Sequence, residues 1–155
     1  MGGSGDIPAG AHPLNAHFII HASGRWNRPG EYGCLYTALA PETAEAEHRK
    51  ARDRAGIFGE RPREIVGIDV MVAPVLDLTS RTRRRRLGVR SSDLRSDEDE
   101  GIEACRAIAD AARAEGYRGI LAPSAAGRDG RVLVIYLEGP PAGLDMQVPD
   151  DRRSL

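Results

Sequence analysis

The chain has 155 residues, with 22 basic and 23 acidic side chains and a formal net charge of −1 at neutral pH. This length allows one domain with a sizeable core, and the balanced charge excludes a bulk attraction to nucleic acid or to an anionic membrane. The two cysteines are far apart and match no disulfide or metal-binding spacing, so we expect reduced core residues and no metal site.

The N-terminal segment lacks the features of a targeting sequence. Residues 1–14 are rich in glycine and contain neither a basic region nor an apolar run, which predicts a flexible leader. No apolar stretch of the chain approaches the ~20 residues of a membrane helix. We therefore expect a cytoplasmic protein that does not contact membranes.

The first expected elements are two strands and a helix. His17–Ala22 and Cys34–Leu39 are apolar runs of strand length, separated by a polar loop with a Pro-Gly turn. Pro41 is typical of a first helical turn, and the following pattern predicts a helix that runs to about Arg54.

The middle of the chain contains a strand pattern, a basic segment and a helix pattern. Apolar residues alternate over Glu64–Leu78, which predicts a long strand that bends or lies at a sheet edge at Pro74. Thr79–Ser96 is polar and rich in arginine, with short helical pieces expected. Apolar residues then recur at helical spacing over residues 102–112, and Gly116 is expected to end that helix.

Two more strands are expected, followed by a tail. Gly119–Ala122 and Arg131–Leu137 are apolar runs joined by a hairpin-like turn. Residues 140–155 are dominated by proline, glycine and charge, which predicts a mobile C-terminal tail. Strands and helices in this mixed order predict an α+β domain with a mixed sheet. No glycine-rich phosphate loop follows a strand, which argues against a doubly wound dinucleotide-binding fold.

Four polar residues are candidates for a site, and each also has a purely structural explanation. Arg25 could fork onto a pyrophosphate, or it could lie solvated above a core Trp26. Glu47 could face a cleft beneath the second strand, or it could pair with Arg54 or Lys50 on the helix surface. Ser124 follows a predicted strand, which suits a site or an ordinary turn, and no GxSxG elbow surrounds it. His21 could face the same cleft as Arg25.

The densest run of charge is Arg81–Arg86, which contains five arginines. Such a run suits a solvated face, an acidic protein partner or RNA. No aromatic side chains are interleaved with it for base stacking. A solvated face is therefore favoured, followed by docking of a partner protein, and direct contact with nucleic acid is not expected.

The order of the motifs, taken together, resembles the RES domain family, named for an arginine, a glutamate and a serine. Gly-Arg-Trp-Asn, Leu-Tyr-Thr-Ala, Pro-Glu-Thr-Ala-Glu-Ala-Glu and Gly-Ile-Leu-Ala-Pro-Ser-Ala follow one another here. The resemblance covers about Arg25 to Leu137. It implies one catalytic domain over residues 15–139, with an ADP-ribosyltransferase-like split β-sheet and flanking helices. Many members are NAD-consuming toxins of bacterial toxin–antitoxin pairs, with an Xre-type helix-turn-helix antitoxin as partner.

The resemblance also implies roles for single residues. Glu47 and Tyr36 match the family's helix glutamate and strand tyrosine, so Glu47 would stabilise an oxocarbenium-like ribose and Tyr36 would stack on nicotinamide. Arg25 would bind the pyrophosphate, and Ser124 would hydrogen-bond the ribose or the amide. Family members carry a further arginine upstream. No arginine precedes Arg25 here, so Arg25 or His21 takes that role, or the site is incomplete.

These features lead to one main hypothesis and two alternatives. The main hypothesis is an NAD-consuming toxin enzyme that uses NAD as a substrate and needs no cofactor, with water, phosphate or a protein side chain as acceptor. One alternative is an RNA-binding or RNA-targeting toxin that acts through Arg81–Arg86, which would show steeply salt-dependent binding. The other is a non-catalytic module that binds NAD or a partner without turnover.

Overall fold

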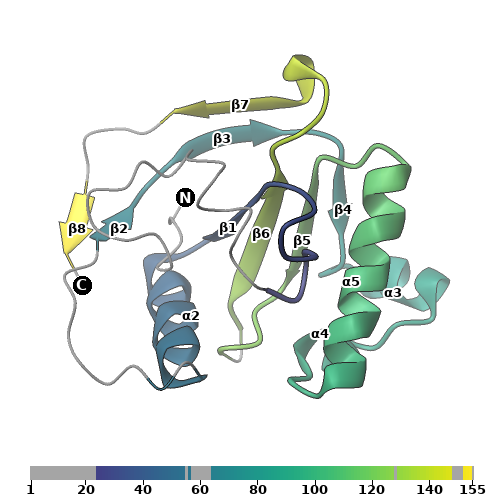
Figure 1. Cartoon of the computed structure of the whole chain (residues 1–155), viewed down its shortest axis with the longest axis horizontal. Helices are drawn as coiled ribbons and strands as arrows, with labels where there is room; N and C mark the ends of the chain where they lie inside the picture. Colours follow the sequence, from purple (N-terminus) through teal and green to yellow (C-terminus); the bar gives the residue numbers. More distant parts are fainter. Residues whose placement is uncertain (1–23, 55, 57–63, 128, 148–151, 155) are drawn as a thin grey trace.

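A four-stranded mixed sheet with strand order β1-β6-β5-β4 organises the molecule (Figure 1). The computed structural model describes residues 24–54, 56, 64–127, 129–147 and 152–154. The strands of this sheet are β1 (Cys34–Ala38), β6 (Arg131–Tyr136), β5 (Gly119–Pro123) and β4 (Val75–Asp77). β6 pairs antiparallel with both β1 and β5, whereas β4 runs parallel to β5. The expected α+β class with a mixed sheet is confirmed.

Four helices accompany this sheet in the described part of the chain: α2 (Pro41–Arg54), α3 (Arg81–Leu87), α4 (Ser91–Arg95) and α5 (Asp99–Ala114). The first turn of α2 and of α5 contains acidic side chains, which are favourable at the positive end of a helix. Gly88 and Gly116 follow α3 and α5 with φ of 68° and 88°, a backbone conformation that favours glycine. The predicted bounds of α2 and the predicted end of α5 before Gly116 are confirmed. No described helix has the length and apolar character needed to cross a membrane.

Both faces of the sheet are buried, because alternate strand residues enter two different apolar clusters. On β6, Val132, Val134 and Tyr136 join the cluster that α4 and α5 complete. The intervening Leu133 and Ile135 join the second cluster. Helix residues of the first cluster are Leu94, Cys105, Ala109 and Ala112, and the second is covered by Val70, Val72, Leu144 and Met146. The sheet is thus held between helices and a separate strand pair, which fixes the positions of its strand ends.

The predicted long strand over residues 64–78 is wrong in its continuity. The structure divides it into β2 (Glu64–Val66), β3 (Asp69–Val72) and β4, which belong to three separate sheets. β2 pairs with β8 (Arg152–Ser154), and β3 pairs with β7 (Leu144–Gln147). Two-residue alternation is the same in one bent strand and in three short ones, so the pattern could not reveal these breaks. The strand predicted at His17–Ala22 and the leader lie outside the described residues.

The predicted mobile tail also differs from the structure, because residues 141–147 form a short 3-10 helix and then β7. The buried side chain of Arg118 fastens this segment by donating from Nη1 to Pro140 O at 2.5 Å and from Nη2 to Leu137 O at 2.9 Å. Gly143 approaches Arg118 so closely that an added Cβ would lie 3.3 Å from Nη1. Mobility was predicted from composition alone, which carries no information about these tertiary contacts.

The buried thiol of Cys34 gives a testable dependence of stability on pH. Burial raises the pKa of Cys34 to about 12 and raises the pKa of Tyr36 and Tyr136 in the same direction. The folded state therefore keeps protons that the unfolded chain loses above about pH 9, the ordinary value for a thiol. These three groups should leave the free energy of unfolding in urea unchanged between neutral pH and about pH 9. Above pH 9 the thiol should lower it by about 1.4 kcal/mol per pH unit, and each tyrosine should add a similar slope above pH 10, its ordinary value. A slope that is unchanged in Cys34→Ala would contradict this prediction.

Candidate active site

Glu47 on α2 and Ser124 after β5 meet directly. Ser124 Oγ donates to Glu47 Oε1 at 2.6 Å, across 77 positions of sequence. Ser124 Oγ also accepts a hydrogen bond from the backbone N–H of Ala126 at 3.1 Å, so both the proton and the oxygen of this hydroxyl have a partner. Ser124 is 1% exposed, and Glu47 is partly exposed. A part-buried carboxylate therefore receives a hydrogen bond from a rigidly held serine at the end of a core strand.

The close approach of α2 to the loop after β5 makes this contact possible. Ser124 N donates to Gly130 O at 2.8 Å, which closes the loop over residues 124–130. A Cβ at Gly130 would lie 2.7 Å from the side chain of Thr43 and 3.3 Å from Ser124 Cβ. Only glycine fits there without a shift, so the loop packs directly on the helical turn that precedes Glu47.

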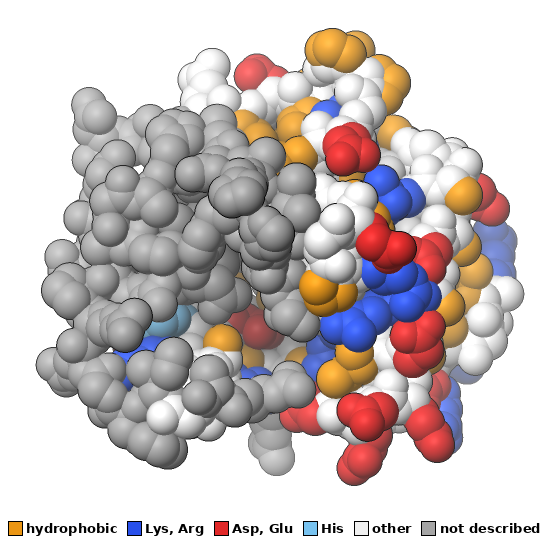
Figure 2. Space-filling model, viewed as in Figure 1, with side chains coloured by type: hydrophobic (Ala, Val, Ile, Leu, Met, Phe, Trp, Pro, Cys, Tyr) orange, Lys and Arg blue, Asp and Glu red, His pale blue; other side chains and the backbone are white. Residues whose placement is uncertain are grey.

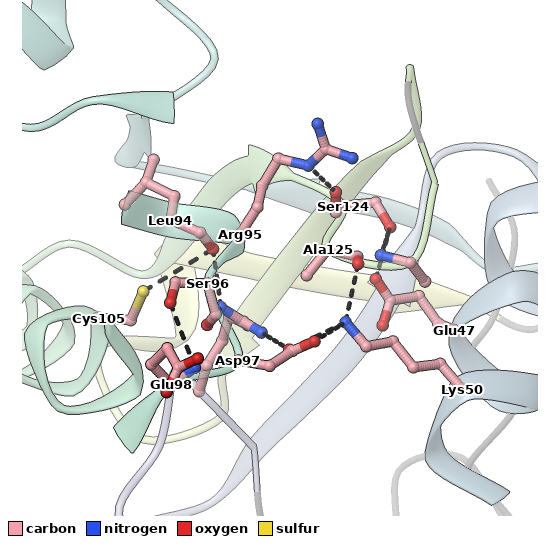
Figure 3. A network of polar contacts seen from close by, with 12 residues as sticks. Glu47, Lys50, Leu94, Arg95, Ser96, Asp97, Glu98, Cys105, Ser124 and Ala125 are labelled. Atoms are coloured by element: carbon pink, nitrogen blue, oxygen red, sulfur yellow. Dashed lines mark hydrogen bonds and ion pairs between the residues drawn. The ribbon is translucent and has the colours of Figure 1, made fainter. Parts of the chain in front are cut away.

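Two cationic side chains hold the backbone carbonyls of the same loop (Figure 3). Arg95 donates to Ser124 O at 2.9 Å from Nε and to Gly127 O at 2.6 Å from Nη2. Lys50 donates to Ala125 O at 2.8 Å. Hydrogen bonds from charged donors are stronger than those between neutral groups. Arg95 and Lys50 therefore fix the loop that carries Ser124.

Arg25 joins the same network from the opposite side. Its Nη1 donates to Leu94 O at 2.9 Å and to Ser96 O at 2.7 Å, and its Nη2 donates to Asp97 Oδ1 at 2.8 Å. Asp97 also forms an ion pair with Lys50, at 2.8 Å. The Arg25 side chain is 11% exposed, so it is not the solvated arginine of the structural alternative.

Tyr36 is fixed through its hydroxyl, beside the segment that carries Arg25. The hydroxyl donates to Asn27 Oδ1 at 2.5 Å and accepts the backbone N–H of Trp26 at 3.1 Å. Gly24 packs against it, because a Cβ there would lie 2.3 Å from Tyr36 Oη. Burial raises the pKa of Tyr36 well above its ordinary value, so the phenol is neutral. Tyr36 as a whole residue is partly exposed, although Gly24 packs against its ring.

The structure thus places four of the five predicted residues in one region. Glu47 and Ser124 are bonded to each other, and Arg25 reaches them through Asp97 and Lys50. Tyr36 contacts the backbone of the residue that follows Arg25. His21 lies outside the described residues. Trp26 is 1% exposed and fills the core, as its structural explanation predicted.

Three residues of this region were not predicted as site residues: Lys50, which was considered only as a surface partner of Glu47, Arg95 and Asp97. Lys50 and Arg95 donate to backbone carbonyls, and a sequence motif does not indicate such contacts. Lys50 is the only lysine of the chain and lies three residues after Glu47, one helical turn away. This spacing is the one signal that could have indicated it.

The arginine run forms α3, which has no buried side chain. Arg84 donates to Leu78 O, and the other arginine side chains of α3 make no hydrogen bond or ion pair with described residues. α3 therefore takes no part in the Glu47–Ser124 network. On the described part of the face seen in Figure 2, basic and acidic side chains are interspersed, so this face offers no extended surface of one sign.

Comparisons with known proteins show the family to which the chain belongs. The RES domain model matches residues 7–155, and the chain belongs to the RES domain family. The NAD(+) phosphorylase MbcT of Mycobacterium tuberculosis is 32% identical over 133 residues, which cover 82% of this chain and 69% of that protein. A probable NAD(+) phosphorylase of the same species is 32% identical over 118 residues, which cover 76% of this chain and 55% of the relative.

A solved structure extends the likeness to the fold. The chain is similar to a protein in the crystal structure of the M. tuberculosis MbcT–MbcA toxin–antitoxin complex, with a TM-score of 0.77 and 26% identity. The match covers 96% of this chain and 80% of that one. The overall fold of this chain is therefore shared by a protein of a solved toxin–antitoxin complex.

Replacing Arg95 tests whether the cations hold the loop. Arg95→Ala leaves two carbonyls without their charged donor, so the free energy of unfolding should fall by about 1–3 kcal/mol. Arg90→Ala is the matched control, because that side chain is 83% exposed and, within the described part of the chain, pairs with Asp93 alone, at 3.4 Å. The control should change stability by less than about 0.5 kcal/mol in urea unfolding. Equal losses in both variants would contradict a role of Arg95 in holding the loop.

Proposed function

We propose that this protein is an NAD phosphorylase and the toxin of a toxin–antitoxin pair. The observation that carries the proposal is the 2.6 Å hydrogen bond between Ser124 and Glu47. This bond joins the two residues, Ser124 and Glu47, that the sequence resemblance matches to the serine and the glutamate of the RES family. The named relatives support NAD as substrate and phosphate as acceptor.

The reaction transfers the ribosyl carbon from nicotinamide to phosphate. A phosphate oxygen forms a bond to C1′ of the nicotinamide ribose while the bond from C1′ to the nicotinamide nitrogen breaks. The bonding electrons go to that nitrogen, so nicotinamide leaves as a neutral molecule. Positive charge develops on the ribose in between, as in glycoside cleavage. A fixed negative group beside the ribose lowers the barrier, because it interacts most strongly with the transition state.

Glu47 is the group that would supply this charge. Its carboxylate is held by Ser124, whose proton is directed to Oε1 and whose oxygen accepts the N–H of Ala126. The hydroxyl of Ser124 thus already uses its proton on Glu47 and its oxygen on Ala126. We assign to Ser124 the role of orienting Glu47. This arrangement does not favour a nucleophilic role for the serine.

Tyr36 and Arg25 would bind the two ends of NAD. The fixed ring of Tyr36 would stack on nicotinamide, since its hydroxyl is already satisfied by Asn27 and Trp26. Arg25 would contact the pyrophosphate with the donors that it does not use on backbone carbonyls. His21 is proposed as a further contact to the substrate, in place of the upstream arginine of other family members.

Nicotinamide release by the purified full chain tests the catalytic role. Glu47→Gln should lower kcat at least about 100-fold, the scale seen when one preorganised electrostatic group is removed. Glu45→Gln is the matched control on the same helix, because Glu45 is exposed and its one ion pair among the described residues is with Arg49, at 3.4 Å. The control should retain its rate. Equal losses in the two variants, or no release by the wild type, would refute the proposal.

The dependence on phosphate distinguishes the acceptor. Nicotinamide release should rise with inorganic phosphate and saturate, and mass spectrometry should detect ADP-ribose carrying one added phosphate. Release at the same rate in phosphate-free buffer, with free ADP-ribose as product, would favour hydrolysis.

We also propose an Xre-type helix-turn-helix protein as the antitoxin. The support is that the similar solved structure is a toxin–antitoxin complex. Co-expression with the neighbouring reading frame should yield a stable complex in which nicotinamide release is suppressed. A neighbouring product that neither binds nor inhibits would contradict this partner.

A further inference from the structure

Asp97 lies between Arg25 and Lys50, and each of these cations also donates to backbone carbonyls. Its Oδ1 accepts from Arg25 at 2.8 Å and from Lys50 at 2.9 Å, while its Oδ2 lies 2.8 Å from Lys50. A carboxylate bridged in this way by a guanidinium and an ammonium is an anion in a cationic site. The next question is what holds each cation in place.

Arg25 is held by backbone. Its Nη1 donates to Leu94 O and Ser96 O, and these carbonyls remain where they are if the carboxylate turns away. Only Nη2 points at Asp97. Loss of the carboxylate would therefore leave a positioned guanidinium with free N–H donors.

Lys50 is held in the same manner. Its Nζ donates to Ala125 O at 2.8 Å, and an ammonium carries three protons, so others remain for an anion. Ala125 follows Ser124 directly. The second cation is thus anchored to the loop whose serine contacts Glu47.

Asp97 itself is the part that can move. It lies between α4 and α5, outside both helices, and its side chain is 48% exposed. Rotation into solvent would unpack no core residue. The three charged groups sum to one positive charge, and they sum to two when the carboxylate has left.

We propose that Arg25 and Lys50 form a phosphate-binding subsite and that Asp97 closes it until a phosphate group of a substrate displaces the carboxylate. The proposal rests on the proposed function, since phosphorolysis of NAD involves two phosphate-bearing molecules. Inorganic phosphate and the pyrophosphate of NAD present the same chemistry to the two cations. Both carry more charge than one carboxylate, and arginine forks onto either. Asp97 thereby sets the affinity of the site for its anionic substrate.

Steady-state kinetics of Asp97→Asn test the subsite and identify its ligand. KM for NAD at saturating phosphate and KM for phosphate at saturating NAD are measured separately. The KM of the molecule that uses the subsite should fall about two- to fivefold, the scale of one partly exposed ion pair. Glu98→Gln is the matched control: it removes the same charge one residue away, from an exposed side chain without an ion pair among the described residues. An unchanged or raised KM in Asp97→Asn, or an equal fall in both variants, overturns the proposal.

A binding measurement separates failure of this proposal from failure of the proposed function. ADP-ribose and inorganic phosphate are titrated calorimetrically into Glu47→Gln protein with and without Asp97→Asn, or with Asp97→Ser if the asparagine variant does not fold. Tighter binding of one probe without the carboxylate supports the subsite even if no NAD is cleaved. Equal or weaker binding overturns it. So does an ADP-ribose complex in which Asp97 still bridges Arg25 and Lys50.

Discussion

The candidate site depends on cations that donate to backbone carbonyls. Arg95, Lys50 and Arg25 together bind carbonyls of the 94–97 and 124–127 segments, which are distant from one another in sequence. Hydrogen bonds to carbonyls neutralise no charge, so the three cations keep their charge beside two carboxylates, Glu47 and Asp97. The same contacts therefore fix the loops in place and provide an electrostatic environment suited to an anionic substrate.

The sheet supplies the rigidity that this arrangement requires. β5 is buried on both faces and is tightly packed at its start, where a Cβ at Gly119 would lie 2.9 Å from Val134 O. Its other end leads directly into Ser124. α2 follows β1 on the far side of β6, so the serine and the glutamate come from elements that a central strand separates. Sites built on such supported elements hold their geometry better than sites on free loops.

The sequence predicted those parts of the fold that a single local pattern determines. α2, α5, β1, β5 and β6 each follow one periodicity, and their positions agree with it. The three strands within residues 64–78 and the strand β7 depend instead on pairing partners and on the buried Arg118, which no local pattern encodes. The site divides in the same way. Glu47 and Ser124 were identified through motif order, whereas Arg95 escaped notice because its acceptors are backbone atoms.

Arg25 shows why the role of a matched residue has to be derived from its contacts. The family resemblance implied a guanidinium free to bind a pyrophosphate, but here it already makes three hydrogen bonds. A guanidinium has five donors, and two of these bonds share one nitrogen and go to the backbone. The group can therefore hold the 94–97 segment permanently and still exchange its one carboxylate partner for a phosphate. In this arrangement Nη1 of Arg25 holds the backbone of the 94–97 segment, and Nη2 is the nitrogen that would contact the substrate.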